Sequence, residues 1–373
     1  PLLLDWLMTP EAPAIARESA ALGLGLLRRS APARQLAPLR LDGIRGNLLQ
    51  VFDGRAGKER IEVTPRIRQF AILGLGLLGD QPFTDDPHSK DGRLMSQLLW
   101  QRLTVLPFRT HDAPIAILNA LSLQPPEGIS TAIREGLRDL VDGKKFKGRK
   151  FHPRVRAHAL TAFIRLGTSS ERSYLGRLIG NPRTPYEVKI AAIVALGSEA
   201  ERMASVERVV AARVLQSALE ATKQELLSAG ILNLALGEVL GADLREGSER
   251  VLRATKTGDL LRSRARRMPW YLQGFAALAL GTALRDVKAP NADCATAKFQ
   301  AQATEQLRQL LSNSRKEEDV RAAAAVALGL IGDPESQEPL ASIVRNPKRT
   351  GDFRGYAALA TAMIGIEKSN ILE

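Results

Sequence analysis

The chain has 373 residues, of which 45% are hydrophobic and 25% are charged, a balance that excludes an intrinsically disordered protein. Because only 5% of the residues are aromatic, the core has to be built mainly from Ala, Leu, Ile and Val. The 53 Lys and Arg residues outnumber the 40 Asp and Glu residues and give a formal net charge of +13. This charge favours anionic partners: nucleic acid, anionic lipid or an acidic protein face.

The single cysteine and the lack of a long apolar run narrow the class of protein further. Cys294 alone excludes an intrachain disulfide and a cysteine metal cluster. No run approaches the roughly 20 apolar residues that cross a bilayer, so we expect no transmembrane segment. A cytoplasmic location is favoured. The envelope or periplasm is the alternative, because the chain starts at Pro1 without an initiating Met and targeting residues would precede it.

A thirteen-residue pattern recurs seven times along the chain. In its clearest copy, Val320–Gly332, apolar or small residues follow at intervals of three and four, as on one face of a helix. The fifth position is always Ala and the eighth is always Ala or Gly, so we expect close helix contacts there. Such recurrence indicates a repeat protein. The copies are Ala16–Arg28, Ile67–Gly79, Val155–Gly167, Val188–Ala200, Leu272–Leu284, Val320–Gly332 and Phe353–Gly365.

Each copy is predicted to be the first helix of a helix–turn–helix unit. In the clearest unit, Gly332 and Pro334 end the first helix, and a second helix follows around Leu340. Weaker copies at Asp112–Leu123 and Leu227–Gly241 fill the longer gaps between the strong ones. The sequence therefore predicts an all-α solenoid of about nine stacked antiparallel helix pairs, with a right-handed superhelix and no sheet.

We expect one continuous domain over residues 1–373, as a fragment of a longer chain. The last copy, Phe353–Gly365, is followed by only eight residues, too few for a second helix. Its apolar stripe should therefore be covered by further chain or by a partner. That stripe consists of Phe353, Tyr356, Ala357, Ala360 and Ile364. The alanines expected at buried helix contacts are Ala71, Ala159, Ala192, Ala276, Ala324 and Ala357.

The motif V-R-x-A-A-x-x-A-L-G-x-I-G-D of Val320–Asp333 resembles HEAT repeats, in particular the Ala-rich HEAT-like type named after phycobilisome lyases. The resemblance covers nearly the whole chain and implies stacked helix pairs. It leaves the function open, because the family includes scaffolds, chromophore-lyase subunits, nucleic-acid-binding proteins and a few enzymes. The basic second position matches a family feature that is usually structural. The resemblance thus implies an inter-repeat ladder of Arg17, Arg68, Arg156, Lys189, Arg321 and Arg354.

Motifs that carry chemistry are missing from the sequence. The four histidines, His88, His111, His152 and His158, form neither an HExxH motif nor the His-Glu pairs of HEAT-type iron hydroxylases. There is no GxSxG elbow and no Walker loop. His158 is expected in the core, and the loop residues Asp85 and Asp86 are a weak candidate for holding a cation. We therefore predict no catalytic residue, no metal site and no cofactor.

Basic segments with neighbouring aromatic residues are the best remaining signal of a binding site. Lys and Arg beside stacking rings are typical of proteins that hold phosphate backbones and unpaired bases, and the same charges suit an acidic protein face. We interpret 143–156 and 261–271 as basic loops, with 345–354 as a third. The candidate residues are Lys144, Lys145, Phe146, Lys147, Arg149, Lys150 and Phe151 in the first, Arg262, Arg264, Arg266, Arg267 and Trp270 in the second, and Lys348 and Arg349 in the third.

Three functions stay open from the sequence alone. The leading hypothesis is a non-enzymatic scaffold that presents a helical-repeat surface to a protein partner or a larger assembly, with an acidic face on the partner. The alternative is a nucleic-acid-binding HEAT-like solenoid that uses the basic segments; HEAT-like DNA glycosylases belong to this class. A lyase-like subunit that acts on a chromophore protein is the third.

Overall fold

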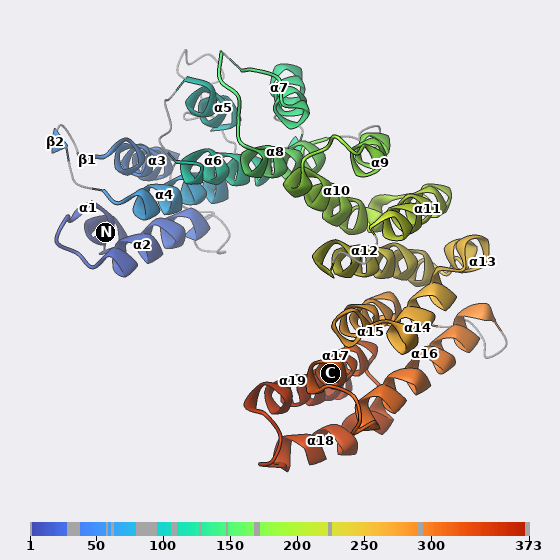
Figure 1. The fold of residues 1–373 in the computed structure, drawn as a ribbon. Coiled ribbons are helices and arrows are strands. Elements are labelled where there is room, and N and C mark those ends of the chain that lie inside the picture. The colour runs from blue at the N-terminus through green and yellow to red at the C-terminus, as the bar shows by residue number, and fades with distance from the viewer. Residues whose placement is uncertain are drawn as a thin grey trace. The chain divides into compact units, whose positions relative to one another are not determined.

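The computed structural model describes residues 2–27, 38–56, 59–60, 63–79, 95–105, 110–126, 129–146, 148–167, 172–222, 226–288 and 294–369. This part of the chain is almost entirely helical and confirms the predicted all-α repeat fold (Figure 1). The chain divides into two compact units. The first comprises Pro1–Glu171 and Pro185–Ala191, and the second comprises Arg172–Thr184 and Ala192–Glu373. The right-handed superhelix and the single domain stay predictions.

Nineteen α-helices lie in the described residues. In chain order they are α1 Leu2–Met8, α2 Ala14–Leu26, α3 Pro38–Asp53, α4 Pro65–Leu78, α5 Met95–Val105, α6 Asp112–Ser122, α7 Thr131–Asp142, α8 Pro153–Arg165, α9 Arg172–Gly180, α10 Tyr186–Ser198, α11 Ser205–Ala221, α12 Leu226–Arg245, α13 Arg250–Thr255, α14 Thr257–Arg267, α15 Trp270–Leu284, α16 Ala295–Ser312, α17 Glu318–Ile331, α18 Gln337–Arg345 and α19 Gly351–Ser369. Two short 3₁₀ helices, η5 Ala200–Arg202 and η6 Pro334–Ser336, join some of them.

The strong copies of the repeat all form helices, and every one except the copy in α10 is the second helix of a packed pair and not the first. In the first unit α1 packs on α2, α3 on α4, α5 on α6 and α7 on α8. In the second unit α11 packs on α12, α14 on α15, α16 on α17 and α18 on α19. The predicted phase of the repeat was therefore wrong, because a turn in the sequence shows where a helix ends but not which neighbour the helix packs against.

The second position of the repeat ties the two helices of a pair together. The Nε of Arg321 donates a hydrogen bond of 2.9 Å to the carbonyl of Leu311, near the end of α16. Gln273 replaces the basic residue in α15, and its amide donates to the carbonyl of Arg266 at the end of α14. The last carbonyls of a helix lack a partner within the helix, so these side chains satisfy them. Other bonds of this kind join Arg17 to Leu7, Arg156 to Val141 and Arg354 to Val344. Arg68 donates instead to Val63, just before its own helix α4, and the side chain of Lys189 forms no such bond with a described residue.

The resemblance implied a ladder of basic side chains between repeats. Because the copies pack on the helices that precede them, most of these hydrogen bonds lie instead within helix pairs. This position is structural in at least one copy for a further reason. Arg321 is only 4% exposed, and its guanidinium carbon lies 4.9 Å from the centre of the Phe353 ring in α19. Burial lowers the pKa of Arg321. A buried and internally bonded guanidinium of this kind is not available to a ligand.

Glycine at the tenth position of the repeat lets successive copies touch. A Cβ added to Gly281 of α15 would lie 2.5 Å from the Cα of Ala327 in α17, and one added to Gly329 of α17 would lie 2.8 Å from the Cα of Ala360 in α19. Ala327 and Ala360 occupy the eighth position of their copies. The copies therefore stack as a ladder, and we call them the ladder helices: α2, α4, α6 and α8 in the first unit, and α12, α15, α17 and α19 in the second (Figure 1). The predicted burial of Ala71, Ala159, Ala192, Ala276, Ala324 and Ala357 is confirmed, since each is 0% exposed.

Two local features differ from the predictions. A short antiparallel hairpin pairs β1, Arg55–Ala56, with β2, Glu59–Arg60, so the fold is not wholly free of sheet. Leu227–Arg245 of α12 is long and apolar enough to cross a membrane, contrary to our expectation, although 78% of its apolar window is buried within the fold. Helix α12 packs against α11, α14 and α15, and a helix that is covered on several sides is apolar nearly all round.

The apolar stripe of α19 is mostly covered by the chain itself, which corrects the prediction for the last copy. Phe353, Ala357, Ala360 and Ile364 are each at most 1% exposed, because α19 packs on both α17 and α18. The helices that cover the stripe both precede it in the sequence. Tyr356 alone among the predicted residues stays open, with 50% of its surface exposed.

Candidate interaction surfaces

The loop between α7 and α8 uses part of its basic cluster internally. The ammonium of Lys144 donates to Asp139 at 2.6 Å, and this hydrogen bond raises the pKa of Lys144. Phe146 packs edge-on against Trp100 of α5, with ring centroids 5.3 Å apart, so its ring anchors the loop and is not free to stack on a base. Lys144, Lys145 and Lys150 are exposed, Arg149 and Phe151 are half-buried, and Lys147 lies outside the described residues.

Residues 261–267, predicted to be a basic loop, instead form the second part of helix α14. Arg262 donates to Gln302 of α16 at 2.5 Å, and Arg264 donates to Asn233 of α12 at 2.9 Å. Burial lowers the pKa of Arg264. These two arginines hold α14 against its neighbours. The segment is helical because residues of fair helix propensity run from Asp259 to Arg267 without a Gly or a Pro.

The exposed remainder of this basic cluster lies at the corner between α14 and α15. Arg266 and Arg267 point into solvent there, next to Trp270 and Tyr271, whose rings meet edge to face at 5.8 Å. Trp270 is 50% exposed and Tyr271 is 37% exposed. Of the four arginines in the second basic segment, only the two at this corner are exposed, so the four do not form one exposed cluster.

The third basic segment forms the turn between α18 and α19. Arg349 makes an ion pair of 3.3 Å with Glu318, the residue that also accepts hydrogen bonds from Thr350, and these contacts lower the pKa of Glu318, the Thr350 hydroxyl most of all. Lys348 is exposed. The α7–α8 loop belongs to the first unit and the other two basic segments belong to the second, so neither unit by itself collects all three.

The histidines form no metal site within the described part of the chain, where no group of three or more potential ligands occurs. His111 and His152 stack with ring centroids 4.5 Å apart, and the Nδ1 of His152 accepts the backbone N–H of Arg154 as a cap of α8. His158 is half-buried and not in the core; its Nδ1 lies 3.0 Å from the amide oxygen of Asn119, and burial lowers its pKa. Asp85, Asp86 and His88 lie outside the described residues.

An apolar stripe that was not predicted from the sequence crosses the ladder helices of the second unit and the end of α10, where a Cβ added to Gly197 would lie 3.0 Å from the Cα of Ala235 in α12. The fourth, seventh and eleventh positions of each copy share one helix face, and in this unit all of them are exposed or half-buried. Glu238 is the only charged residue among them, although a helix face open to water normally carries polar side chains. We call this stripe the ladder face: Val194, Ser198, Ile231, Leu234, Glu238, Phe275, Leu278, Thr282, Ala323, Val326, Leu330, Tyr356, Leu359 and Met363.

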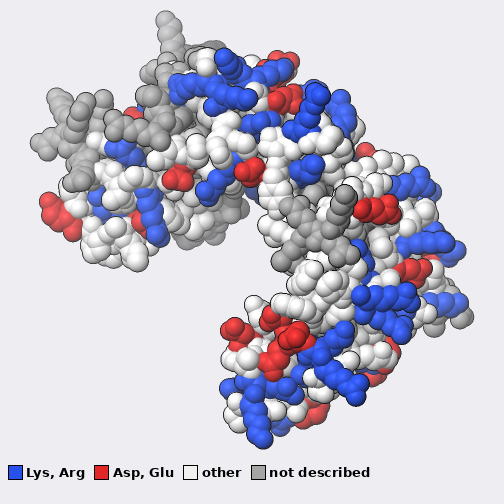
Figure 2. Space-filling model, in the orientation of Figure 1, with Lys and Arg blue, Asp and Glu red and all other residues white. Residues whose placement is uncertain are grey.

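The basic side chains of the second unit gather mainly on helices outside the ladder. Figure 2 shows Lys and Arg side chains over α11, α13 and α14, mostly uncharged surface over α15, and acidic side chains over α19. Several ladder-face side chains are well exposed, among them Val194 at 52% and Leu359 at 51%. The sequence contains a sign of this surface. Apolar residues recur at the fourth, seventh and eleventh positions, which would be polar in a helix that buries only one face.

The fold and its ladder of stacked helices define a helical-repeat protein of the α-solenoid class. Within this class, residues 258–360 match a family model of HEAT repeats. No curated protein sequence matches the chain.

Solved structures of low sequence identity align with the chain over most of its length. Human deoxyhypusine hydroxylase in complex with glycerol is 16% identical, with 98% of this chain and 95% of that chain covered and a TM-score of 0.29. Kap121p bound to Pho4p is 14% identical, with 97% and 41% covered and a TM-score of 0.37. Kap121p bound to Ste12p is 14% identical, with 99% and 46% covered and a TM-score of 0.35. The chain thus spans less than half the length of Kap121p.

Proposed function

We propose that the chain is a non-enzymatic interaction scaffold whose ladder face, in the second unit, binds an apolar segment of a protein partner. The observation that carries the proposal is the run of aliphatic and aromatic side chains at the fourth, seventh and eleventh positions of successive copies. Contiguous apolar surface of this kind is uncommon on soluble proteins unless another molecule covers it.

The relative size of apolar and ionic contributions favours the ladder face over the basic segments as the main source of affinity. Full burial of one Val, Leu or Phe side chain contributes about 1.5–3 kcal/mol. An exposed ion pair contributes about 0–1 kcal/mol and is screened by salt. A partner that covers Val194, Phe275 and Leu359 would therefore gain more from this face than from several contacts with surface lysines.

The finer resemblance to repeats of the phycobilisome-lyase type is part of this proposal, since the match over 258–360 is to HEAT repeats in general. On that resemblance, a chromophore protein is one kind of partner that the ladder face would serve. An acidic face on the partner would add to the apolar contact, because exposed basic side chains lie elsewhere on the same unit.

The test is affinity capture of partners by the intact chain after nuclease treatment. We expect partners to survive the nuclease and to be lost from the variant that combines Val194→Asp with Leu359→Asp, because a buried carboxylate opposes apolar docking. The matched control is Leu2→Asp, which alters an apolar side chain of α1 that is 62% exposed. Partners that stay bound to the double variant would show that the ladder face is not the docking surface.

Nucleic-acid binding is the second candidate, and the exposed Lys145 and Lys150 of the α7–α8 loop favour it. Their charges have no carboxylate partner among the described residues, so a phosphate backbone would neutralise them and release counterions. In the capture experiment, loss of all partners on nuclease treatment would support this function and oppose the scaffold.

A further inference from the structure

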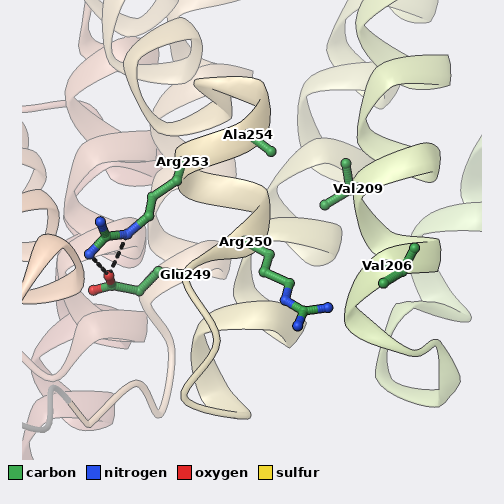
Figure 3. Close-up of a pocket in the computed structure, with 6 residues that line it drawn as sticks. All are labelled: Val206, Val209, Glu249, Arg250, Arg253 and Ala254. Atoms are coloured by element: carbon green, nitrogen blue, oxygen red, sulfur yellow. Dashed lines mark hydrogen bonds and ion pairs between the residues drawn. The ribbon is translucent and has the colours of Figure 1, made fainter.

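A shallow groove lies on the outer layer of the second unit, away from the ladder face. Its volume is about 550 Å³, and it runs between α11 and α13. Val206 and Val209 of α11 line one side, and Arg250 and Ala254 line the other (Figure 3). The groove is open to solvent, since Val206 is 61% exposed.

The valines of this groove are not needed by the core of the unit. Helix α11 buries its other side, where Ala211, Ala212 and Leu215 are at most 4% exposed. Val206 and Val209 line the groove on the open side of α11, and Val210 beside them in the helix is 57% exposed. A helix that already has a buried stripe gains nothing in folding from a second apolar spot that faces water.

The acidic side chains around the groove are already engaged by the chain. Glu249 accepts hydrogen bonds from Arg253 and from the backbone N–H and hydroxyl of Thr296 in α16. These contacts, that with Arg253 first, lower the pKa of Glu249 to about 2. On the α11 side, Glu207 accepts from the guanidinium of Arg172 at 2.9 Å. Neither carboxylate is left to neutralise a further cation.

One arginine of the groove has no such carboxylate. Arg250 extends across the groove toward Val206 in Figure 3 and forms no ion pair with a described residue. The groove therefore joins an aliphatic side to an unneutralised guanidinium group, and guanidinium groups bind carboxylates with two parallel hydrogen bonds.

We propose that this groove docks a segment of a protein partner in which acidic side chains stand beside aliphatic ones. The aliphatic side chains cover Val206 and Val209, and a carboxylate pairs with Arg250. The groove is a different surface from the ladder face, and docking in it does not depend on that face.

The test uses a labelled synthetic peptide of helical pattern that carries Leu at positions four apart with Glu beside them, measured by fluorescence anisotropy with the full chain. Two matched peptides replace Glu by Lys or Leu by Ser. We expect only the first peptide to bind, and we expect both Arg250→Glu and Val206→Ser to weaken it about tenfold. Arg267→Glu and Val194→Ser, on other surfaces of the unit, should leave its affinity unchanged.

Three results would overturn the proposal. One is the lack of peptide binding. Another is an affinity that neither Arg250→Glu nor Val206→Ser alters. In a parallel titration with duplex DNA, binding that Arg250→Glu weakens and Val206→Ser does not would make the groove a polyanion site. Because Val194→Ser alters only the ladder face, a failure of the ladder-face proposal would be seen separately.

Discussion

Single residues set the spacing of the ladder. The tenth position of the repeat is Gly in α15 and α17, and the backbone of the next copy lies where a side chain would be. Close approach of this kind lets backbone pack on backbone and excludes water without large side chains, which suits a chain with few aromatic residues. Ile164 takes the tenth position in α8, the last ladder helix of the first unit, so the glycine pattern is interrupted there.

A single methyl group should therefore have opposite effects at two glycines. Gly281→Ala places a Cβ 2.5 Å from the Cα of Ala327, and we expect it to lower the free energy of unfolding by about 1–3 kcal/mol through overpacking. Gly355→Ala, in the exposed part of α19, meets nothing within 4 Å and should raise stability by about 0.5–1 kcal/mol because Ala favours the helix. Urea denaturation of both variants checks this contrast, and equal effects would contradict the close-contact argument.

At the scale of elements, one carboxylate joins two helices of the second unit. Glu249 precedes α13, pairs with Arg253 of that helix and accepts the backbone N–H of Thr296 in α16 at 2.7 Å. Its side chain is only 17% exposed, so water screens these contacts weakly. The docking of α16 therefore depends in part on the ionised form of this residue.

The acid stability of the chain should show this dependence. The pKa of Glu249 is lowered from the usual 4.5 to about 2, so the contribution of its carboxylate is complete above pH 4.5 and is lost as the pH falls toward 2. We expect Glu249→Gln to melt at a lower temperature than the native chain at neutral pH, with a difference that shrinks across this window. Calorimetry at several pH values measures it. Glu220→Gln, at an exposed position of α11, is the control and should follow the native curve.

At the scale of the whole molecule, the net charge of +13 is spread over separate basic segments of both units. Several of the basic residues that the sequence offered as a binding site are tied to other parts of the chain. Arg262 and Arg264 hold α14 in place, and Arg349 pairs with Glu318. The positive charge that remains available is therefore smaller and more dispersed than the linear clusters indicate.

If the chain binds nucleic acid, the α7–α8 loop should dominate the salt dependence of that binding. We expect Lys145→Glu with Lys150→Glu to weaken duplex DNA binding and to reduce the slope of log K against log salt by about 0.9 for each phosphate that the loop no longer neutralises. Lys348→Glu, which changes an exposed lysine of the second unit, should have a smaller effect. Anisotropy titrations at two salt concentrations decide this, and no binding by the native chain at low salt would eliminate the function.

The sequence by itself determined the helical content, the repeat and the positions of close contact. Small residues recur at the fifth and eighth positions for a local reason, since helix periodicity places both on one face and Ala324 or Ala357 must fit beneath a neighbour. These inferences need only the order of residues along one helix, and the burial of the alanines confirms them.

Only the tertiary structure decided which helix each copy packs on, and most of the candidate sites depend on that choice. The pairing with the preceding helix sends Arg321 to the carbonyl of Leu311 and covers the stripe of α19. It also leaves the fourth, seventh and eleventh positions open, so that side chains such as Val194 and Leu359 form a face and not a core. A linear pattern shows that a side chain is apolar, but which apolar face is covered depends on neighbours that are distant in the sequence.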